Sequence, residues 1–530
     1  MNYQIVNVEE AAIAKKYGTS YLVSKLLALS NLSDAKMEEL LHPDLHVHKS
    51  SAPCLLDACA RILKAKENKE KVLIGGDYDA DGICATTIMK DTLDRLKIEN
   101  GYYIPNRFKE GYGLQVHTVE DAHKKGYTLL ITVDNGVKAF AALEKAKELG
   151  MDVIVTDHHQ IEEEVPCDIL VHPNYLEEEF AFLSGAGVAL LISLELIGEV
   201  KEHIALAAIA LIADVMPLYR QTRTIVQVGL DYLKQGILPP IQALIKRNSL
   251  IDERTISFQV VPKLNSIGRM EDDSNVNTLI PYLLLQDKNE IQAYATKLEE
   301  INERRKSLSA TMSAQARQLL DEEEIQVLYD SSFHEGICGL VAGKIADEVH
   351  KPTLVLTKKE DTLRGSGRSV AGFNLFDFFK DFPSFTAFGG HEGAIGLSLK
   401  EEDLSKLHNY IKEKLKEMPV IQEEVVVPAI LVDADRLQFD NLNDLEILKP
   451  YPKDLIRPLF AIENPEIIRV REYPKVTKYT IAQKDGEMEG VLFVSRKLED
   501  VEQPKYFIGE LGLNRWKDEI TIQMEIEYLE

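Results

Sequence analysis

The sequence predicts an α/β protein with a parallel-sheet domain, a long helix, a second α/β domain and a C-terminal β-barrel. Three observations predict this order. Short apolar runs alternate with helical runs over residues 51–215, and a similar alternation returns over residues 324–420, which is typical of βαβ units. Residues 287–323 form one charged helical pattern without glycine or proline. Strand-like runs dominate residues 421–530.

These patterns divide the chain of 530 residues into five parts. The expected parts are a helical N-terminal lead-in over 1–50, a domain over 51–286, a connecting helix over 287–323, a domain over 324–420 and the barrel over 421–530. Leucines recur at helical spacing in the lead-in, so we expect it to pack as a cap on the domain that follows it. A helix of about 35 residues is about 50 Å long, which is enough to join two domains.

The overall charge is strongly acidic, because 61 Lys and Arg residues face 86 Asp and Glu residues and give a net charge of −25. Such a balance argues against a protein that coats nucleic acid nonspecifically, although it leaves room for a local basic groove. The five cysteines form no C-x-x-C pair, so we expect reduced thiols and a cytoplasmic protein. No apolar run approaches ~18 residues, so we expect no membrane span.

A cluster of carboxylates follows the first predicted strand of the 51–286 domain. Asp77, Asp79 and Asp81 lie within five residues of the run G-G-D-Y-D-A-D-G, between an apolar run and a helical run. Like charges this close repel each other, so a cation is expected, and Mg²⁺ or Mn²⁺ prefers carboxylate oxygens. A plain Asp/Gly turn is the alternative. An EF-hand loop is excluded, because its twelfth residue should be Glu and is Ile88.

More metal-ligating residue types follow the later predicted strands of this domain. In a parallel sheet the carboxyl ends of the strands meet at one edge, so these side chains are expected to converge. They are Asp134, Asp157, His158, His159 and His172. Asp214 ends an apolar helix, where the helix dipole disfavours an anion, so a cation partner is the better explanation for it.

Two glycine-rich segments of the 324–420 domain, 364–369 and 388–396, are expected to be loops. Their backbone N–H groups can approach an anion closely, and Arg368 offers a bidentate fork for phosphate. The alternative for His391 is a surface position in a tight turn. A further polar loop is expected at 262–269, after a strand-like run over 256–261, and Arg269 in isolation would be a surface ion pair.

The strand spacing over residues 421–530 is close to that of a small barrel, and such barrels often bind single strands by stacking bases on aromatic side chains. The candidate aromatic residues are Tyr473, Tyr479, Phe493 and Tyr506. Aromatic residues in strands belong more often to a core, so both interpretations stay open.

Seven motifs occur in a recognisable order. They are D-Y-D-A-D-G, V-D-N-G, D-H-H, A-D-V, L-N-S-I-G-R, G-S-G-R-S and G-G-H-E-G-A-I-G. This set resembles the DHH phosphoesterase superfamily and, within it, the RecJ-like single-stranded-DNA-specific exonucleases. The resemblance implies a DHH catalytic domain over 51–286, a DHH-associated domain over 324–420 and an OB-like nucleic-acid-binding domain over 421–530.

The resemblance also implies roles for individual residues. Two Mn²⁺ or Mg²⁺ ions would be held by Asp79, Asp81, Asp134, His158 and Asp214, with Asp134 as the bridge. Some relatives carry a His at the position of Gly75, so Asp77 or a water would complete one site. His159 and Arg269 would contact the scissile phosphate, and Asp157 would orient the His158 ring. The substrate-binding residues would be Asn265, Ser366, Arg368, Ser369, Gly389, Gly390 and His391.

The function that the resemblance implies is a metal-dependent 5′-to-3′ exonuclease that hydrolyses single-stranded DNA to 5′-mononucleotides in DNA repair and recombination. A monomer is expected, with a single-strand binding protein and a RecQ-like helicase as candidate partners. Two other functions stay open: a DHH phosphodiesterase acting on short oligonucleotides or cyclic dinucleotides, and a catalytically inactive DHH replication scaffold. The barrel favours a long substrate, and the intact metal-ligating residues weigh against an inactive scaffold.

Overall fold

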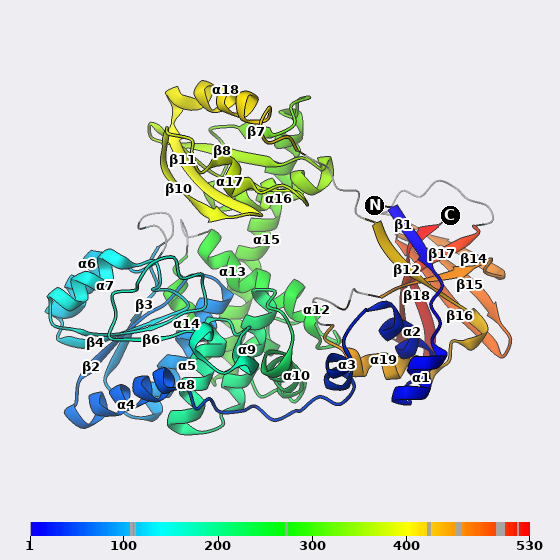
Figure 1. Cartoon of the computed structure of the whole chain (residues 1–530), viewed down its shortest axis with the longest axis horizontal. Coiled ribbons are helices and arrows are strands. Elements are labelled where there is room, and N and C mark those ends of the chain that lie inside the picture. Colours follow the sequence, from blue (N-terminus) through cyan, green and yellow to red (C-terminus); the bar gives the residue numbers. More distant parts are fainter. Residues whose placement is uncertain are drawn as a thin grey trace. The chain divides into compact units, whose positions relative to one another are not determined.

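The protein is described from a computed structural model (Figure 1) over residues 2–106, 110, 113–270, 274–420, 426–451, 455, 458–493, 504–516 and 519–529. The chain forms two compact units. The larger unit comprises Val47–Met216 and Ile225–Glu423, and the smaller one comprises Met1–His46, Pro217–Thr224 and Glu424–Glu530. The five-part division expected from the sequence is finer than these two units and stays a prediction. No helix among the described residues is long and apolar enough to cross a membrane.

A parallel five-stranded sheet with the order β3-β2-β4-β5-β6 forms the base of the larger unit, as expected. Its strands are β2 (Lys71–Gly75), β3 (Asn100–Tyr103), β4 (Tyr127–Val133), β5 (Asp152–Thr156) and β6 (Ile169–Val171). The central strands are apolar and buried, which is typical of a sheet covered on both faces. The strand order reverses beside β2, and ligands bind at the carboxyl ends of the strands near such a point.

Helices cover this sheet and form the layers around it. The helices that pack on the sheet or on each other are α4 (Pro53–Asn68), α5 (Ala80–Arg95), α6 (Val116–Lys124), α7 (Phe140–Glu148), α8 (Gly185–Ile197) and α9 (Lys201–Ala213). The helices α5, α8 and α9 pack against one another, and the near-continuous apolar sequence of α8 and α9 agrees with burial on all sides. Further helices along the chain are α10 (Arg220–Lys234), α11 (Pro239–Gln242), α12 (Glu253–Thr255) and α14 (Leu279–Leu283).

The expected strand over 256–261 and the expected loop over 262–269 are both wrong. The chain instead forms a π-helical turn, η3 (Ile256–Val260), which continues into helix α13 (Val261–Arg269). The apolar residues Ile256, Val260, Leu264 and Ile267 are buried, and their spacing of three to four residues is helical. Pro262 follows directly on this π-helical turn and has no backbone N–H to donate to the preceding turn.

The long helix predicted between the two α/β domains is confirmed as α15 (Lys288–Gln318). It begins at Asp287, whose side chain accepts hydrogen bonds from the N–H groups of Asn289 and Glu290. With its 31 residues the helix is about 46 Å long. It packs against α13 near its start and against helix α16 (Cys338–Val349) further along.

A second five-stranded sheet, with the order β10-β11-β9-β8-β7, follows α15. Its elements are β7 (Gln326–Tyr329), β8 (Thr353–Lys359), β9 (Thr362–Arg368), β10 (Phe385–His391), β11 (Ala394–Lys400) and the helices α17 (Leu375–Phe379) and α18 (Leu404–Lys414). The expectation of two glycine-rich loops is wrong, because both segments lie largely in strands of this sheet. A Cβ at Gly365 would lie 2.1 Å from the carbonyl oxygen of Val355, so glycine permits the close approach of β9 to β8.

The smaller unit contains an eight-stranded sheet with the order β1-β12-β13-β17-β18-β16-β15-β14. Its strands are β1 (Asn2–Val6), β12 (Val426–Val432), β13 (Leu459–Glu463), β14 (Ile467–Tyr473), β15 (Val476–Gln483), β16 (Gly486–Phe493), β17 (Tyr506–Trp516) and β18 (Glu519–Leu529). Helix α19 (Phe439–Leu445) lies between β12 and β13 in the sequence.

The N-terminal segment differs from its expectation in two ways. It contains a strand, β1, which pairs in parallel with β12, before its helices α1 (Ala11–Tyr17), α2 (Tyr21–Leu29) and α3 (Asp34–Leu41). Its leucines, among them Leu22 and Leu26, belong to the same apolar core as Ile430 and Phe460. The segment therefore shares a core with the C-terminal strands, whereas a cap on the domain that follows it was expected.

Candidate active site

Acidic and histidine side chains meet at the carboxyl ends of three parallel strands of the larger unit. Asp77, Asp79 and Asp81 follow β2, Asp134 follows β4, and the Asp157-His158-His159 run follows β5. Three overlapping groups place ligand atoms within 4.8 Å of one another. The groups are Asp77, Asp79 and Asp134; Asp81, His158 and Asp214; and Asp134, His158 and His159. Asp134 and His158 each belong to two groups, so the ligand set forms one continuous centre.

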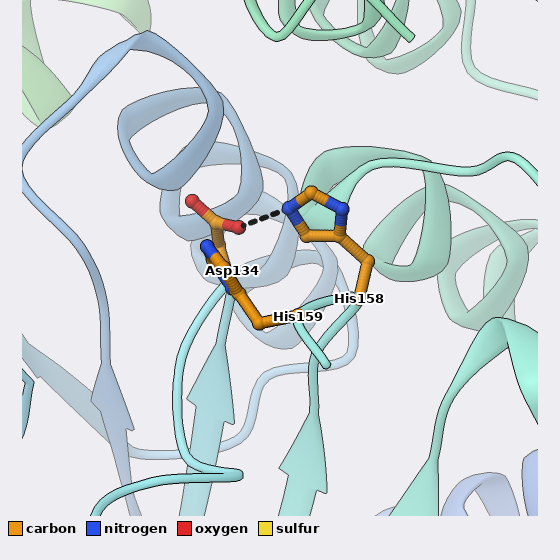
Figure 2. A group of neighbouring side chains, drawn as sticks. All are labelled: Asp134, His158 and His159. Carbon is orange, nitrogen blue, oxygen red and sulfur yellow. Dashed lines mark ion pairs between the residues drawn. The ribbon is translucent and has the colours of Figure 1, made fainter. Parts of the chain in front are cut away.

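The His158 ring points at three carboxylates. Its Nε2 atom lies 3.2 Å from Asp134 Oδ1, 3.3 Å from Asp214 Oδ2 and 3.6 Å from Asp81 Oδ2. Figure 2 shows the first of these pairs. Neighbouring ligands of an octahedral ion with bonds of 2.0–2.1 Å are about 3 Å apart, so the spacing fits a shared ion. An imidazole among carboxylates fits Mn²⁺ better than Mg²⁺.

Asp134 and His158 each bury a polar atom that makes no hydrogen bond. Within the described part of the chain, neither Asp134 Oδ1 nor His158 Nε2 has a hydrogen-bond partner. Asp134 is 1% exposed. Buried polar atoms of folded proteins nearly always have a partner, and a bound cation would satisfy both atoms at once. The residues therefore fit a divalent-ion centre.

The pKa shifts of Asp134 and His158 also fit a divalent-ion centre. Burial raises the pKa of the Asp134 carboxyl well above its usual value, and the Asp81 and Asp79 charges add to the shift. Burial alone would lower the pKa of His158, but its pairing with Asp214 and the nearby carboxylate charges raise it to about 9. Without a cation these groups hold protons, and a divalent ion would displace those protons when it binds.

Asp81 is held by the first turn of α8. Its carboxylate accepts hydrogen bonds from Ser184 Oγ at 2.9 Å, from the Gly185 N–H at 2.7 Å and from the Ala186 N–H at 2.8 Å. The N-terminus of a helix favours an anion, so this turn favours the ionised form of Asp81. The sequence contained a signal for this role, since a serine followed by Gly-Ala-Gly opens a helix with accessible N–H groups, but that signal alone does not identify the anion that the turn holds.

Backbone geometry brings Asp134 to the same point. Its φ of 59° lies in the left-handed region, which Asp tolerates better than most residues. A Cβ at Gly185 would lie 2.4 Å from the Cβ of Asp134, so only glycine lets the start of α8 approach this close. Asp79 caps α5, because its Oδ1 accepts hydrogen bonds from the Asp81 and Gly82 N–H groups.

The expectation that Asp157 orients the His158 ring is wrong. Asp157 Oδ1 lies 2.7 Å from His159 Nδ1 and also accepts the N–H groups of His158 and His159, and Asp157 Oδ2 accepts the Val137 N–H. Burial alone would raise the Asp157 pKa, but the hydrogen bond and charge of His159 lower it below its usual value. Asp157 thus orients His159, because that ring folds back over the turn whereas the His158 ring points toward Asp134.

A polar pocket of about 440 Å³ lies beside the metal-ligating residues. Asp79 and Asp214 line it from one domain, and Arg368 and His391 line it from the other. Further lining residues are Tyr78, Asn265, Arg269, Glu335, Gly336, Gly339 and Ser366. Arg269 and Arg368, Ser366 and the start of α16 all line this pocket, which makes it suited to a phosphate group.

A second pocket, of about 550 Å³, lies on the His159 side. It is lined by Asp157, His159, Gly389, Gly390, His391 and residues of the V-D-N-G turn and its continuation. His391 lines both pockets, so the side chains expected to contact phosphate surround the metal-ligating cluster on two sides.

Family models match three stretches of the chain. The model described as DHH family, N-terminal domain, matches residues 71–214, the DHHA1 domain matches 322–417, and the RecJ OB domain matches 430–528. Single-stranded-DNA-specific exonuclease RecJ from Escherichia coli K12 is 30% identical over 407 residues, and the match covers 69% of this chain and 70% of that protein. The chain belongs to the RecJ family.

Other members of the RecJ family match the chain over more of its length. RecJ from Bacillus subtilis 168 is 31% identical over 496 residues, which cover 89% of this chain but only 62% of that protein. A crystal structure of Thermus thermophilus RecJ in complex with Mn²⁺ matches all of this chain and 79% of its own with a TM-score of 0.84 and 23% identity. A structure of exonuclease RecJ bound to manganese matches 71% of this chain and 97% of its own at 28% identity and a TM-score of 0.62.

The RecJ-type fold brings most of the expected substrate-binding residues together, with one exception. Asn265, Ser366, Arg368 and His391 line the polar pocket, and Gly389 and Gly390 line the second pocket. Ser369 lines neither pocket, and its hydroxyl donates a hydrogen bond to the Phe373 carbonyl. The hydroxyl closes a turn in this structure, and the expected role of Ser369 in substrate binding stays a prediction. Asn265 also supports the metal-ligating turn, since its Oδ1 accepts the Ala80 N–H.

The four aromatic candidates in the RecJ OB domain divide into two classes. Tyr473 and Phe493 are 47% and 43% exposed, whereas Tyr479 packs edge-on against Phe507 with a 5.1 Å centroid separation. Tyr506 donates a hydrogen bond from its hydroxyl to Glu463. Tyr473 and Phe493 are the exposed rings of these four and are therefore the better candidates for base stacking.

Proposed function

We propose that this chain is a divalent-metal-dependent exonuclease that removes 5′-mononucleotides from the 5′ end of single-stranded DNA. One observation carries the proposal: the cluster around Asp134 and His158 opens beside a pocket that holds Arg269, Arg368 and His391. Membership of the RecJ family supports the substrate, since its relatives bear the name single-stranded-DNA-specific exonuclease.

The metal ligands in this proposal are Asp77, Asp79, Asp81, Asp134, His158 and Asp214, with Asp134 between the two sites. Two bound divalent ions would polarise the phosphodiester, lower the pKa of a bound water and stabilise the entering and leaving oxygens. The manganese-bound RecJ structure at 28% identity supports Mn²⁺, and Mg²⁺ remains the alternative. The first turn of α8 favours the ionised form of Asp81 that a metal ligand needs.

Side chains of the chain itself would position the substrate. Arg269 and Arg368 would bind phosphate oxygens, because a guanidinium presents several N–H donors in one plane. His159 would donate a hydrogen bond from Nε2 to the scissile phosphate, since Asp157 occupies its Nδ1. Asp157 orients the ring through this contact, and the hydrogen bond donated by Nε2 would stabilise the negative charge that grows on phosphorus oxygens.

One face of the β14–β15–β16 meander would bind the strand away from the site. Arg469, Arg471 and Tyr473 alternate along β14, and they pair across the sheet with Thr480, Lys478 and Val476 of β15. Val476 pairs in turn with Phe493 of β16, so the two exposed aromatic rings lie on the same face as the basic side chains. Cationic side chains interleaved with aromatic rings are typical of single-strand binding surfaces. Lys478 is paired with Glu489 on this face, so Arg469 and Arg471 would supply the positive charge that meets the strand.

Several finer statements stay predictions from the sequence and from the resemblance. These are the place in DNA repair and recombination, the single-strand binding protein and RecQ-like helicase as partners, the monomeric state, the cytoplasmic location and the five-part division of the chain.

The test offers 5′-labelled and 3′-labelled single strands, duplex DNA and a dinucleotide to the full chain, with Mn²⁺ or with EDTA. We expect labelled mononucleotide from the 5′-labelled single strand only, and no product in EDTA. Asp134→Asn should lower the rate by at least about 10³-fold, because it removes a carboxylate from two ligand groups. Asp121→Asn, at an exposed position on α6, is the matched control and should keep the rate.

Three outcomes would contradict the proposal. Activity in EDTA would exclude the metal centre. Preferential hydrolysis of the dinucleotide would favour a short-substrate phosphodiesterase. Absence of any hydrolysis by a folded, Mn²⁺-binding chain would favour an inactive scaffold.

A further inference from the structure

His172 lies at the end of β6 and takes no direct part in the proposed chemistry. Its side chain is buried, with 3% of its surface exposed. Its Nε2 atom lies 2.9 Å from the carbonyl oxygen of His159, and the Asn174 N–H donates to its Nδ1 at 3.1 Å. The ring therefore joins the start of the 3₁₀ turn η1 (Pro173–Tyr175) to the last residue of the Asp157-His158-His159 turn.

These two contacts define the state of the ring. A carbonyl oxygen only accepts, so Nε2 must carry a proton, and a backbone N–H only donates, so Nδ1 must be without one. Both hydrogen bonds exist together only in the neutral Nε2–H tautomer. A shorter polar side chain would keep the Asn174 contact as a cap but would not reach the His159 carbonyl.

The His159 carbonyl is one of the few anchors of that turn. Asp157 holds the turn from the inside, because its Oδ1 accepts the N–H groups of His158 and His159. His172 holds the same peptide segment from the end of β6, through its hydrogen bond to the His159 carbonyl. The His158 ring must keep its Nε2 at 3.2 Å from Asp134 Oδ1, so a small rotation of the turn would move a metal ligand.

We propose that His172 is a positioning residue that fixes the Asp157-His158-His159 turn for metal binding, an inference that rests on the proposed metal centre. It acts through the backbone of His159 and touches neither metal nor substrate. Hydrogen-bonding partners one shell away from metal ligands commonly change metal affinity by 10–100-fold when they are removed.

Two substitutions separate the two contacts of the ring. In His172→Asn the amide group replaces the ring near Nδ1, so its oxygen can still accept the Asn174 N–H, but it no longer reaches the His159 carbonyl. In His172→Gln the longer side chain places its amide N–H₂ near Nε2, so it can still donate to that carbonyl. His123→Asn, at an exposed position on α6, is the control for the removal of a histidine.

The experiment titrates the metal-free full chain with Mn²⁺ by calorimetry and records thermal unfolding of each variant in EDTA. We expect H172N to bind Mn²⁺ about 10-fold more weakly, and H172Q and H123N to stay within about 3-fold of the original chain. If H172N does not fold in EDTA, H172Q alone decides the test, and a 10-fold loss of Mn²⁺ affinity in it overturns the inference.

Equal losses of affinity in H172N and H172Q, or no loss in H172N, would show that His172 is only a cap of the η1 turn. A failure of the unaltered chain to bind Mn²⁺ would instead overturn the proposed metal centre, so the two failures are distinguishable.

Discussion

Asp157 acts on His159, and this assignment has a kinetic consequence. Asp157→Asn keeps an oxygen that can accept the backbone N–H groups but removes the carboxylate that orients the His159 ring through Nδ1. We expect kcat on single-stranded DNA to fall by about 10²-fold. Mn²⁺ affinity should change by less than about 3-fold, because in our assignment Asp157 does not orient the His158 ligand. A parallel loss of Mn²⁺ affinity in calorimetry would instead show that Asp157 supports His158.

Val215 is a strained residue next to a metal ligand. Its φ is 54°, and it follows α9 as the left-handed residue of a Schellman motif, in which the Met216 N–H donates to the Leu211 carbonyl. Glycine is the usual residue there, and a β-branched residue in this conformation is uncommon. The side chain is 83% exposed, so little packing compensates for the strain.

Val215→Gly should therefore stabilise the metal-free chain by about 0.5–1 kcal/mol, because relief of the left-handed strain exceeds the added flexibility of the unfolded chain. Urea unfolding in EDTA measures this change. A destabilised variant would show that the Val215 side chain makes a contact that offsets its strain.

At the scale of elements, Glu177 clamps the segment that leads into α4. Its carboxylate accepts hydrogen bonds from Ser50 Oγ at 2.6 Å and from both the N–H and the Oγ of Ser51 at 2.7 Å. Burial alone would raise the Glu177 pKa, but these hydrogen bonds lower it to about 2. A lowered pKa adds stability above the usual pKa, and that stability disappears as the pH falls toward 2.

Glu177→Gln should lower the free energy of unfolding by about 1–2 kcal/mol at pH 7, discounted for partial exposure of the carboxylate. The difference from the original chain should shrink as the pH falls below 4.5 toward the folded-state pKa of about 2. Denaturant unfolding at pH 7, 5 and 4 measures it. A difference in the free energy of unfolding that stays constant, or grows toward low pH, would contradict the stabilising role of the Glu177 carboxylate.

The type of an element was predictable where its sequence pattern is compatible with only one kind of secondary structure. The strands β2, β4 and β5 are short buried apolar runs, and the polar residues at their ends are enough to single out Asp134 and His158. The pattern over residues 256–269 is ambiguous, because an apolar β-branched run is compatible with a strand and also with the buried face of a helix. Tertiary packing resolves this ambiguity, and local sequence does not.

The site residues divide in the same way. A motif at a strand end places a carboxylate to within a few ångströms, so the clustering of these acidic and histidine side chains was predictable from sequence. The partner of Asp157 depends on how two adjacent rings turn, and the contact of His172 depends on the distance between two strand ends. The spacing of residues in the sequence determines neither the orientation of the rings nor the distance between the strand ends.

At the scale of the whole molecule, the docking of the N-terminal helices on the C-terminal strands was not predictable. The residues of that core lie roughly four hundred positions apart, as Leu26 and Ile430 do, and no local signal pairs them. Deletion of residues 426–530 would therefore expose the apolar faces of α2 and α3. Point substitutions are therefore the better probe of strand binding.

Reversing the charge of Arg469 and Arg471 should weaken binding of a long single strand without slowing hydrolysis of a dinucleotide, because the two arginines belong to the smaller unit. The slope of log affinity against log salt should fall by about 0.7 for each phosphate group that the variant no longer binds. Fluorescence anisotropy over a salt series measures this slope. An unchanged slope would exclude the β14–β15–β16 face as the binding surface.

The central claim is that side chains from separate strand ends form a centre for two divalent ions. Calorimetric titration of the metal-free chain with Mn²⁺ tests this claim most directly. The original chain should bind two equivalents, and Asp134→Asn should lose at least one of them, because Asp134 belongs to two of the ligand groups. Absence of binding, or identical binding by Asp134→Asn, would contradict the claim.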